Sequence, residues 1–486
     1  MKSKTGFFKR TRFLGVGGAL ILGIWLATAI AAPAQTFKTL VSFDGTDGQW
    51  PFYDSFVQGR DGNIYGTTYT GGVNGAGTVF KITPEGKLST LYSFCGQTNC
   101  ADGASPYAGL VLATDGNFYG TTWSGGANSQ GTVFKIISQG ALTTLYSFCA
   151  QPNCIDGQNP WAPLVEGMDG SLYGTTSGGG ANSQGTVFKI TEAGTLTTLH
   201  NFAGATNDGA SPYAGLVLAT DGNFYGTSEA GGWSDGTVFK ITSTGNLKLL
   251  YSFDWSDGAW PYAGLVLATD GNFYGTTWSG GANSQGTVFK MTPQGALTSL
   301  YSFCAQPSCL DGEFPAAGLV QASDGNFYGT TTYGGASGDG TVFTITSTGT
   351  LTTLHSFSGP YGDGFQAFPG LLQGTNGLFY GMTRGWGDPC VPGTTVCGTI
   401  YSLDMGLVPF VTFVRNVGRV GQVAEILGQG FTGTTSVSFN GTPATFTVKH
   451  DTYLVATVPA GATTGRVTVA TPGGTLTSNV PFRVRP

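Results

Sequence analysis

The stretch that decides the fold runs from Gly109 to Thr122 and reads Gly-Leu-Val-Leu-Ala-Thr-Asp-Gly-Asn-Phe-Tyr-Gly-Thr-Thr. Two runs rich in β-branched and aromatic residues flank an Asp-Gly pair, the two-residue signal of a β-hairpin. The stretch therefore predicts two antiparallel strands, Gly109–Thr114 and Asn117–Thr122. Copies of its second half recur every 49 to 54 residues, which indicates a repeat architecture. They begin at Asp61, Asp115, Asp169, Asp221, Asp270, Asp324 and Asn376.

Each repeat continues with two more predicted strands. In the second repeat, a Gly-Gly loop leads to Gly131–Ile136, and a short Gly turn leads to Leu142–Phe148. The adjacent apolar residues Val133 and Phe134 fit a strand whose two faces are both buried. Four-stranded sheets that pack on both faces and recur seven times predict a seven-bladed β-propeller over residues 37–405.

The two ends of the repeat array differ from its interior. A lone strand of the fourth type, Thr39–Phe43, precedes the first complete repeat, and the array ends on Gly398–Asp404 without a fourth strand. We therefore predict that Thr39–Phe43 completes the last blade and closes the ring. A linear solenoid would instead need polar caps at its ends.

These repeats resemble the GloVer tandem repeat of secreted bacterial proteins of the choice-of-anchor type. The resemblance covers about residues 37–405 and rests on the repeated words quoted above. The first repeat departs from the pattern at Asp54–Val57, and the last departs from it at Asn376–Leu378. The resemblance implies the architecture and does not imply a biochemical activity.

Residues 408–485 lack the repeat motifs and are similar to the IPT/TIG immunoglobulin-like module. The similarity rests on four motifs in the right order, and Asn440-Gly441 is a hairpin signal. The motifs are Gly428–Phe431, Val437–Gly441, Val458–Gly461 and Gly465–Val469. The expected fold class is all-β: a seven-bladed β-propeller closed by an N-terminal strand, plus a C-terminal immunoglobulin-like β-sandwich. In secreted proteins, this resemblance implies a spacer or interaction role.

The first 34 residues have the layout of a secretory signal peptide. A basic head is followed by an apolar run from Phe13 to Ala32 and by the cleavage motif Ala32-Pro33-Ala34. The alternative is an uncleaved membrane anchor, because the run approaches the length of a span. Cleavage would leave 16 basic and 27 acidic groups, a net charge of −11. So few cations exclude nucleic acid as a partner, and we expect a secreted or cell-surface protein without a membrane span.

Eight cysteines form four near-neighbour pairs, which favours local disulfides in an oxidising compartment. Zinc binding would require two pairs to converge, and the chain has only three histidines. We therefore expect neither a metal nor another cofactor. The predicted pairs are Cys95 with Cys100, Cys149 with Cys154, Cys304 with Cys309, and Cys390 with Cys397.

The acidic residues indicate turns rather than catalysis. Sixteen of the 27 carboxylates occur in Asp-Gly pairs, where Asp bonds the local backbone and Gly adopts a positive φ. Calcium binding is the alternative, but it needs six to eight oxygens on one ion. No carboxylate pair recurs as a glycosidase would require, and His200 and His355 replace Tyr in a repeated strand. We predict no catalytic residues.

Aromatic residues mark one side of the predicted ring. The loops between blades and those between second and third strands meet on this side, and they carry the cysteines and many rings. We predict ligand contacts at Trp50, Trp123, Trp161, Trp260 and Trp278. The alternative is that such rings only pack loop on loop, which the post-proline positions of Tyr107, Tyr213 and Tyr262 favour.

The sequence predicts an exported, non-catalytic binding or structural protein, expected to be a monomer. Its ligand is expected to be a neutral polysaccharide, because aromatic faces and few cations suit uncharged sugars. One alternative is a polysaccharide lyase or glycoside hydrolase, which clustered carboxylates would favour. Another is a cell-surface module that binds a second protein, which a large apolar patch would favour.

Overall fold

The computed structural model describes residues 35–52, 56–232, 235–359, 362–385 and 397–485. The predicted signal peptide, residues 1–34, lies outside these ranges. No helix within them is long and apolar enough to cross a membrane. The helices found there are the single 3-10 turns η1 (Thr98–Cys100), η2 (Pro152–Cys154) and η3 (Pro307–Cys309).

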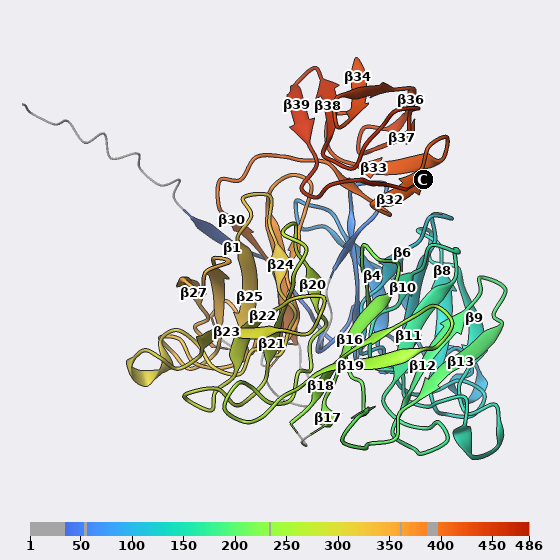
Figure 1. Cartoon of the computed structure of the whole chain (residues 1–486), viewed down its shortest axis with the longest axis vertical. Helices are drawn as coiled ribbons and strands as arrows, with labels where there is room; N and C mark the ends of the chain where they lie inside the picture. The colour runs from blue at the N-terminus through green and yellow to red at the C-terminus, as the bar shows by residue number, and fades with distance from the viewer. Residues whose placement is uncertain (1–34, 53–55, 233–234, 360–361, 386–396, 486) are drawn as a thin grey trace, which may run out of the picture. The chain divides into compact units, whose positions relative to one another are not determined.

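Seven four-stranded antiparallel sheets, here sheets 1 to 7 in chain order, contain most of the strand residues in the described part of the chain (Figure 1). In each sheet a two-residue first strand precedes three longer strands. Sheets 1 to 3 comprise β2 (Val57–Gln58), β3 (Ile64–Thr68), β4 (Thr78–Ile82) and β5 (Leu88–Ser93); β6 (Val111–Leu112), β7 (Phe118–Thr122), β8 (Thr132–Ile136) and β9 (Leu142–Ser147); and β10 (Val165–Glu166), β11 (Leu172–Thr176), β12 (Thr186–Ile190) and β13 (Leu196–Asn201).

Sheets 4 to 7 repeat this strand order, and a small pair, β14 (Gly209–Ala210) with β17 (Ala230–Gly231), adjoins sheet 4. The strands of sheets 4 and 5 are β15 (Val217–Leu218), β16 (Phe224–Ser228), β18 (Thr237–Ile241) and β19 (Leu247–Ser252); and β20 (Val266–Leu267), β21 (Phe273–Thr277), β22 (Thr287–Met291) and β23 (Leu297–Ser302). Those of sheets 6 and 7 are β24 (Val320–Gln321), β25 (Phe327–Thr331), β26 (Thr341–Ile345) and β27 (Leu351–Ser356); and β28 (Leu372–Gln373), β29 (Phe379–Arg384), β30 (Gly398–Asp404) and β1 (Thr36–Ser42).

The first strand of each sheet is shorter than the sequence predicts. In sheet 2, a strand was expected over Gly109–Thr114, but β6 contains only Val111–Leu112. The backbone beyond β6 bonds elsewhere: the Ala113 N–H donates to the Asn117 carbonyl within the turn. The Thr114 N–H donates to the Glu166 carboxylate at 2.9 Å. Turn and side-chain acceptors therefore end the strand early.

The N-terminal strand β1 belongs to sheet 7, the last of the series. It pairs antiparallel with β30, with Phe37 opposite Leu403 and Ser42 opposite Thr399, and the two strands are adjacent in Figure 1. The expected pairing with the last strand is thus present, although β1 begins three residues earlier than predicted. The strand order is β28, β29, β30 and β1, so β1 is the fourth strand of sheet 7.

Consecutive sheets pack against each other through buried apolar clusters of similar composition. Between sheets 2 and 3, Val133 and Phe148 meet Leu172 and Phe188. Equivalent clusters join each successive pair, and one more joins sheet 7 to sheet 1. Each buried Phe or Leu contributes about 1.5–3 kcal/mol. Each face of a sheet packs against an adjacent sheet, and this explains why both faces are apolar.

The C-terminal sheets form a separate pair around their own core, which includes Ile426, Phe439 and Val467. A short parallel pair, β32 (Val417–Arg419) with β40 (Arg483–Arg485), accompanies them. One sheet contains β31 (Thr412–Phe413), β33 (Val423–Leu427), β37 (Tyr453–Thr457) and β36 (Phe446–His450). The other contains β35 (Thr442–Ala444), β34 (Ser436–Phe439), β38 (Val467–Thr471) and β39 (Gly474–Thr477).

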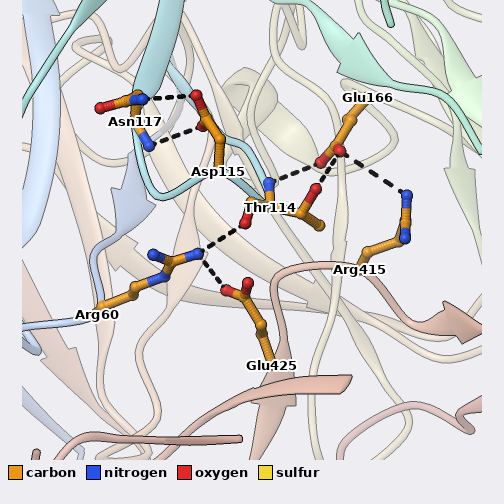
Figure 2. A network of polar contacts seen from close by, with 7 residues as sticks. All are labelled: Arg60, Thr114, Asp115, Asn117, Glu166, Arg415 and Glu425. Carbon is orange, nitrogen blue, oxygen red and sulfur yellow. Dashed lines mark hydrogen bonds and ion pairs between the residues drawn. The ribbon is translucent and has the colours of Figure 1, made fainter. Parts of the chain in front are cut away.

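The turns that follow the first strands of the seven sheets lie on one side of the array, here called the turn side. A polar network joins the C-terminal sheets to this side at sheets 1 to 3 (Figure 2). Arg60 forms an ion pair with Glu425 and donates to the Thr114 carbonyl at 3.0 Å. Glu166 accepts from Thr114 and lies 3.8 Å from Arg415.

Apolar contacts and further turns extend this junction. Leu427 and Tyr453 of the C-terminal sheets join the buried cluster between sheets 1 and 2. Gln429 donates to Thr375 in sheet 7 at 2.9 Å, and Arg485 donates to the Thr220 carbonyl in sheet 4 at 2.7 Å. The C-terminal sheets therefore cover the turn side and leave the opposite ends of the strands to the longer loops.

Three predicted disulfides are present in the loops between sheets: Cys95–Cys100, Cys149–Cys154 and Cys304–Cys309. Cys397 is also disulfide-bonded, whereas Cys390, its predicted partner, lies outside the described residues.

A chain that begins at Gly45 should melt at a lower temperature than one that begins at Gln35, and it should self-associate. The chain that begins at Gly45 lacks β1, so β30 becomes an unpaired edge strand, and such edges promote aggregation. Thermal melts and size-exclusion chromatography of the two chains would test this. Equal midpoints and equal elution would contradict a structural role for β1.

Replacing both Cys95 and Cys100 by serine should lower the free energy of unfolding by about 2 kcal/mol, the value expected for so short a closed loop. The sheets should remain folded, because buried Asp102 still holds the loop by accepting from Tyr92 and the Gly96 N–H. Denaturant unfolding measures the change. Loss of the β-sheet circular dichroism signal in the variant would contradict a merely local role.

Candidate functional site

Seven aromatic side chains form a closed circle on the loop side of the sheets, opposite the turn side. Each ring contacts the next, with centroids 4.0 to 6.0 Å apart. All members except Phe368 are partly exposed. We call this set the aromatic circle; in order, its members are Phe52, Tyr107, Trp161, Tyr213, Tyr262, Trp278 and Phe368.

A repeated backbone arrangement places these rings. In sheet 2 the sequence is Ser105-Pro106-Tyr107, and Ser105 has a φ of 57°. Its N–H donates to the Ala76 carbonyl of sheet 1 at 2.8 Å, and its carbonyl accepts from the Trp123 N–H at 3.0 Å. The equivalent residues of all seven sheets share this positive φ: Trp50, Ser105, Asn159, Ser211, Trp260, Phe314 and Gln366.

The left-handed conformation is costly for bulky residues such as Trp50, Trp260 and Phe314. It persists because main-chain bonds fix both sides of the residue. The Trp50 N–H donates to the Cys397 carbonyl at 2.9 Å, which ties sheet 1 to sheet 7. The aromatic circle is therefore held by backbone geometry that links neighbouring sheets.

Sheet 6 lacks a ring at the repeated position, because Ala316 replaces the aromatic residue there. Trp278, which follows β21 of sheet 5, fills the gap. It stacks on Phe314 at 5.1 Å and on Phe368 at 6.0 Å. The circle is thus completed by a side chain from a different loop.

A cavity of about 400 Å³ adjoins the aromatic circle. Trp161, Tyr213 and Tyr262 line it on the loop side, and the first strands contribute repeated Ala-Gly-Leu segments. The backbones approach closely here, since a Cβ on Gly318 would lie 3.2 Å from the Gly264 carbonyl oxygen, closer than most Cβ contacts. Val480 of the C-terminal segment also lines the cavity.

Two charged residues contact the aromatic circle from different sheets. The Arg384 guanidinium, in sheet 7, lies over the rings of Trp50, Phe52 and Phe368 at 5.0, 5.1 and 5.8 Å. Glu229, in sheet 4, accepts a hydrogen bond from the Tyr262 hydroxyl at 2.9 Å. Burial raises the pKa of Glu229, and the Tyr262 hydrogen bond partly opposes that rise.

The structure brings together three of the five tryptophans predicted to contact a ligand. Trp161 and Trp278 belong to the aromatic circle, and Trp123 contacts Tyr107 and Trp161 edge-on. Trp50 flanks the circle beneath Arg384. Trp260 instead lies edge-on against Trp255 at 5.6 Å. The rings contact one another and remain partly exposed, so their role in binding stays a prediction.

Sequence reasoning missed Phe52, Phe368, Glu229 and Arg384 as members or neighbours of this site. A signal for them exists in the repeat itself. Phe52 and Phe368 align with Tyr107, whereas Glu229 and Arg384 align with Trp123, at the end of the second strand. The repeat positions of Tyr107 and Trp123 both lie on the loop side, so an alignment of the repeats predicts that all four residues lie there too.

Asp side chains in the loops between sheets bond within the protein. Asp102 is fully buried and accepts from the Tyr92 hydroxyl at 2.7 Å and from the Gly96 N–H at 2.9 Å. His200 and His355 replace that tyrosine and contact Asp208 and Asp363. The histidines are thus partners of loop carboxylates, a role that the sequence had not predicted.

One possible metal-ligand group occurs among the described residues: Cys304, Cys309 and Glu313 lie close together. The two cysteines form a disulfide, and a metal requires the thiolate form. The group does not fit a metal site.

Comparison with protein families groups this chain with repeat proteins. The model described as the Gloeobacter/Verrucomicrobia repeat matches residues 26–155, 150–321 and 236–469. No curated protein sequence matches the chain.

Solved structures resemble the chain at low identity. The extracellular domain of a one-component system from B. thetaiotaomicron is 11% identical, with a TM-score of 0.51, and the match covers 93% of this chain and 58% of that one. The extracellular domain of a hybrid two-component system from the same organism is 11% identical, with a TM-score of 0.49 and coverages of 87% and 50%. A fungal alcohol oxidase in complex with copper is 13% identical, with a TM-score of 0.48 and coverages of 93% and 99%. This chain thus spans 58% of the first extracellular domain and 50% of the second.

The successive four-stranded sheets and their aromatic loop side define an all-β repeat protein. The chain belongs to the Gloeobacter/Verrucomicrobia repeat family, whose model covers more than half of it. The similarity of residues 408–485 to the IPT/TIG module stays a prediction.

Glu229→Gln should raise the thermal midpoint at pH 7. Because folding raises the pKa of this carboxyl, its contribution to stability is present at acidic pH and is lost as the pH rises through the folded-state pKa. The glutamine carbonyl still accepts from Tyr262 and carries no charge to desolvate. Melts at pH 4 and pH 7 should show a larger gain at pH 7. A gain that is equal at both pH values, or a loss at pH 7, would contradict the burial effect.

Proposed function

We propose that the seven sheets form a seven-bladed β-propeller over residues 37–405 and that residues 408–485 form an immunoglobulin-like β-sandwich. Two observations support the ring. The strand β1 pairs with β30, and an apolar cluster joins sheet 7 to sheet 1. The sandwich is supported by two four-stranded sheets around one core. We further propose that residues 1–34 are a signal peptide and that the mature protein is secreted or held at the cell surface.

The function that this geometry supports best is a surface binding module that takes a polysaccharide at the aromatic circle. The observation that carries the proposal is the closed circle of partly exposed rings beside a cavity of about 400 Å³. Sugars present apolar C–H faces to such rings, and the stacking requires no charge. The turn side is less available, since the C-terminal sheets cover it. Disulfides in the loops agree with an extracellular location.

One observation favours a second candidate, a polysaccharide lyase or glycoside hydrolase. Glu229 has a raised pKa and lies beside the aromatic circle, as a general acid would. Hydrolysis by paired carboxylates would need a second carboxylate at a defined separation. Turnover of the bound saccharide, lost in the Glu229→Gln variant, would favour this alternative.

Alanine substitutions at Trp161 and Trp278, made singly, should weaken binding of a polysaccharide about ten-fold or more. Each removes one stacking face, and aromatic contacts of this kind are worth about 0.5–1.5 kcal/mol beyond the area that they bury. The matched control is Trp255→Ala, because Trp255 is 43% exposed and lies outside the circle. Isothermal titration against a glycan panel, with thermal melts alongside, measures both effects.

Two results would contradict this proposal. Unchanged affinity in both circle variants would place the site elsewhere. Loss of folding in both variants, with no glycan bound by the unaltered protein, would make the rings purely structural.

A further inference from the structure

Arg384 differs in its surroundings from the basic residues that form ion pairs with carboxylates. Lys189, Lys240 and Lys290 pair with aspartates at the turns, and Arg60 pairs with Glu425. Arg384, in contrast, has no carboxylate within 4.0 Å among the described residues. Its Nη1 donates a long hydrogen bond to the Gln366 amide oxygen, at 3.4 Å.

The guanidinium is nevertheless held in place. The rings of Trp50, Phe52 and Phe368 all lie within 6 Å of it. The main-chain N–H of Arg384 donates to the Gln366 carbonyl at 2.9 Å, which fixes the backbone from which the side chain extends. Its Nε is buried and lacks a hydrogen-bond partner in the described part of the chain. A buried donor without a partner lowers the stability of the fold, so the placement of this side chain reduces stability.

Stacking on aromatic faces leaves the edge of a guanidinium free. That planar edge carries N–H donors in a fork that matches a carboxylate, and such pairs are stronger than neutral hydrogen bonds. We infer that Arg384 binds a carboxylate of the saccharide at the aromatic circle, so that the ligand is an acidic, uronate-containing polysaccharide. This inference rests on the proposed function and changes the neutral ligand that the sequence predicted.

The circle also gives such a ligand a direction. Arg384 contacts Phe52 and Phe368, whereas Glu229 contacts Tyr262. Between Tyr262 and Phe368 the circle contains only Trp278. A carboxylate is attracted to the Arg384 end and repelled from the Glu229 end. The net negative charge of the whole chain matters less, because exposed charges beyond about 8 Å are screened at physiological salt.

The test compares uronate oligosaccharides with the same oligosaccharides after their carboxyl groups have been reduced to alcohols. The full mature chain should bind at least one uronate form about ten-fold more tightly than its reduced form, a difference that should shrink from 50 to 500 mM salt. Arg384→Gln should abolish the preference, so that the uronate and the reduced forms bind this variant with equal affinity. Arg384→Lys should keep part of the preference, because it retains the charge without the fork. The control is Lys248→Gln, on an exposed strand position, which should bind like the unaltered chain.

The outcomes separate this inference from the proposed function. Equal binding of both forms, still weakened by Trp161→Ala, overturns the carboxylate site and leaves the polysaccharide site intact. Tighter binding of a sulfated neutral oligosaccharide than of any uronate overturns the carboxylate in favour of a sulfate ester. A preference that survives in Arg384→Gln, with a lowered thermal midpoint, makes Arg384 a structural residue. If no saccharide binds, both proposals fail.

Discussion

The repeat array depends on the fact that each of sheets 1 to 7 is apolar on both faces. A sheet such as β6–β9 contributes Phe118 and Phe134 to one neighbour, and Val133 and Phe148 to the other. A terminal sheet would leave one such face in water, at a cost of several buried side chains. Sheet 7 avoids this by packing on sheet 1. The N-terminal strand completes that sheet, so the two ends of the array stabilise each other.

This packing also explains where a site can form. The strands bring every long loop to one side, and in each of sheets 1 to 7 the residue equivalent to Ser105 links two consecutive sheets through its main chain. The post-proline side chains are thereby held at regular intervals, and most of them are aromatic. The positions of these side chains are therefore set by backbone bonds between neighbouring sheets.

The opposite side has a different role. Tight Asp-Gly turns offer little side-chain surface, and the C-terminal sheets dock on them through Arg60, Glu166, Glu425 and the apolar contacts of Tyr453. Burial raises the pKa of Glu425, and Arg60 opposes this by its charge. Such a junction holds the C-terminal sheets against the repeat array rather than leaving them on a free linker.

The sequence by itself determined the repeat, the strand order and the local disulfides, because these follow from short-range patterns: the Asp-Gly hairpin, the alternating loops and the cysteine spacing. It also indicated that Thr39–Phe43 would pair with the last strand, since only that strand lacked a partner. Tertiary structure decided the rest. The closed circle needs seven rings from six repeats at once, including Trp278 in place of Ala316, and no single repeat contains that information. The surroundings of Arg384 likewise depend on residues of sheets 1 and 7, more than 300 positions apart, because packing of the last sheet on the first brings Trp50 and Phe52 beneath its guanidinium.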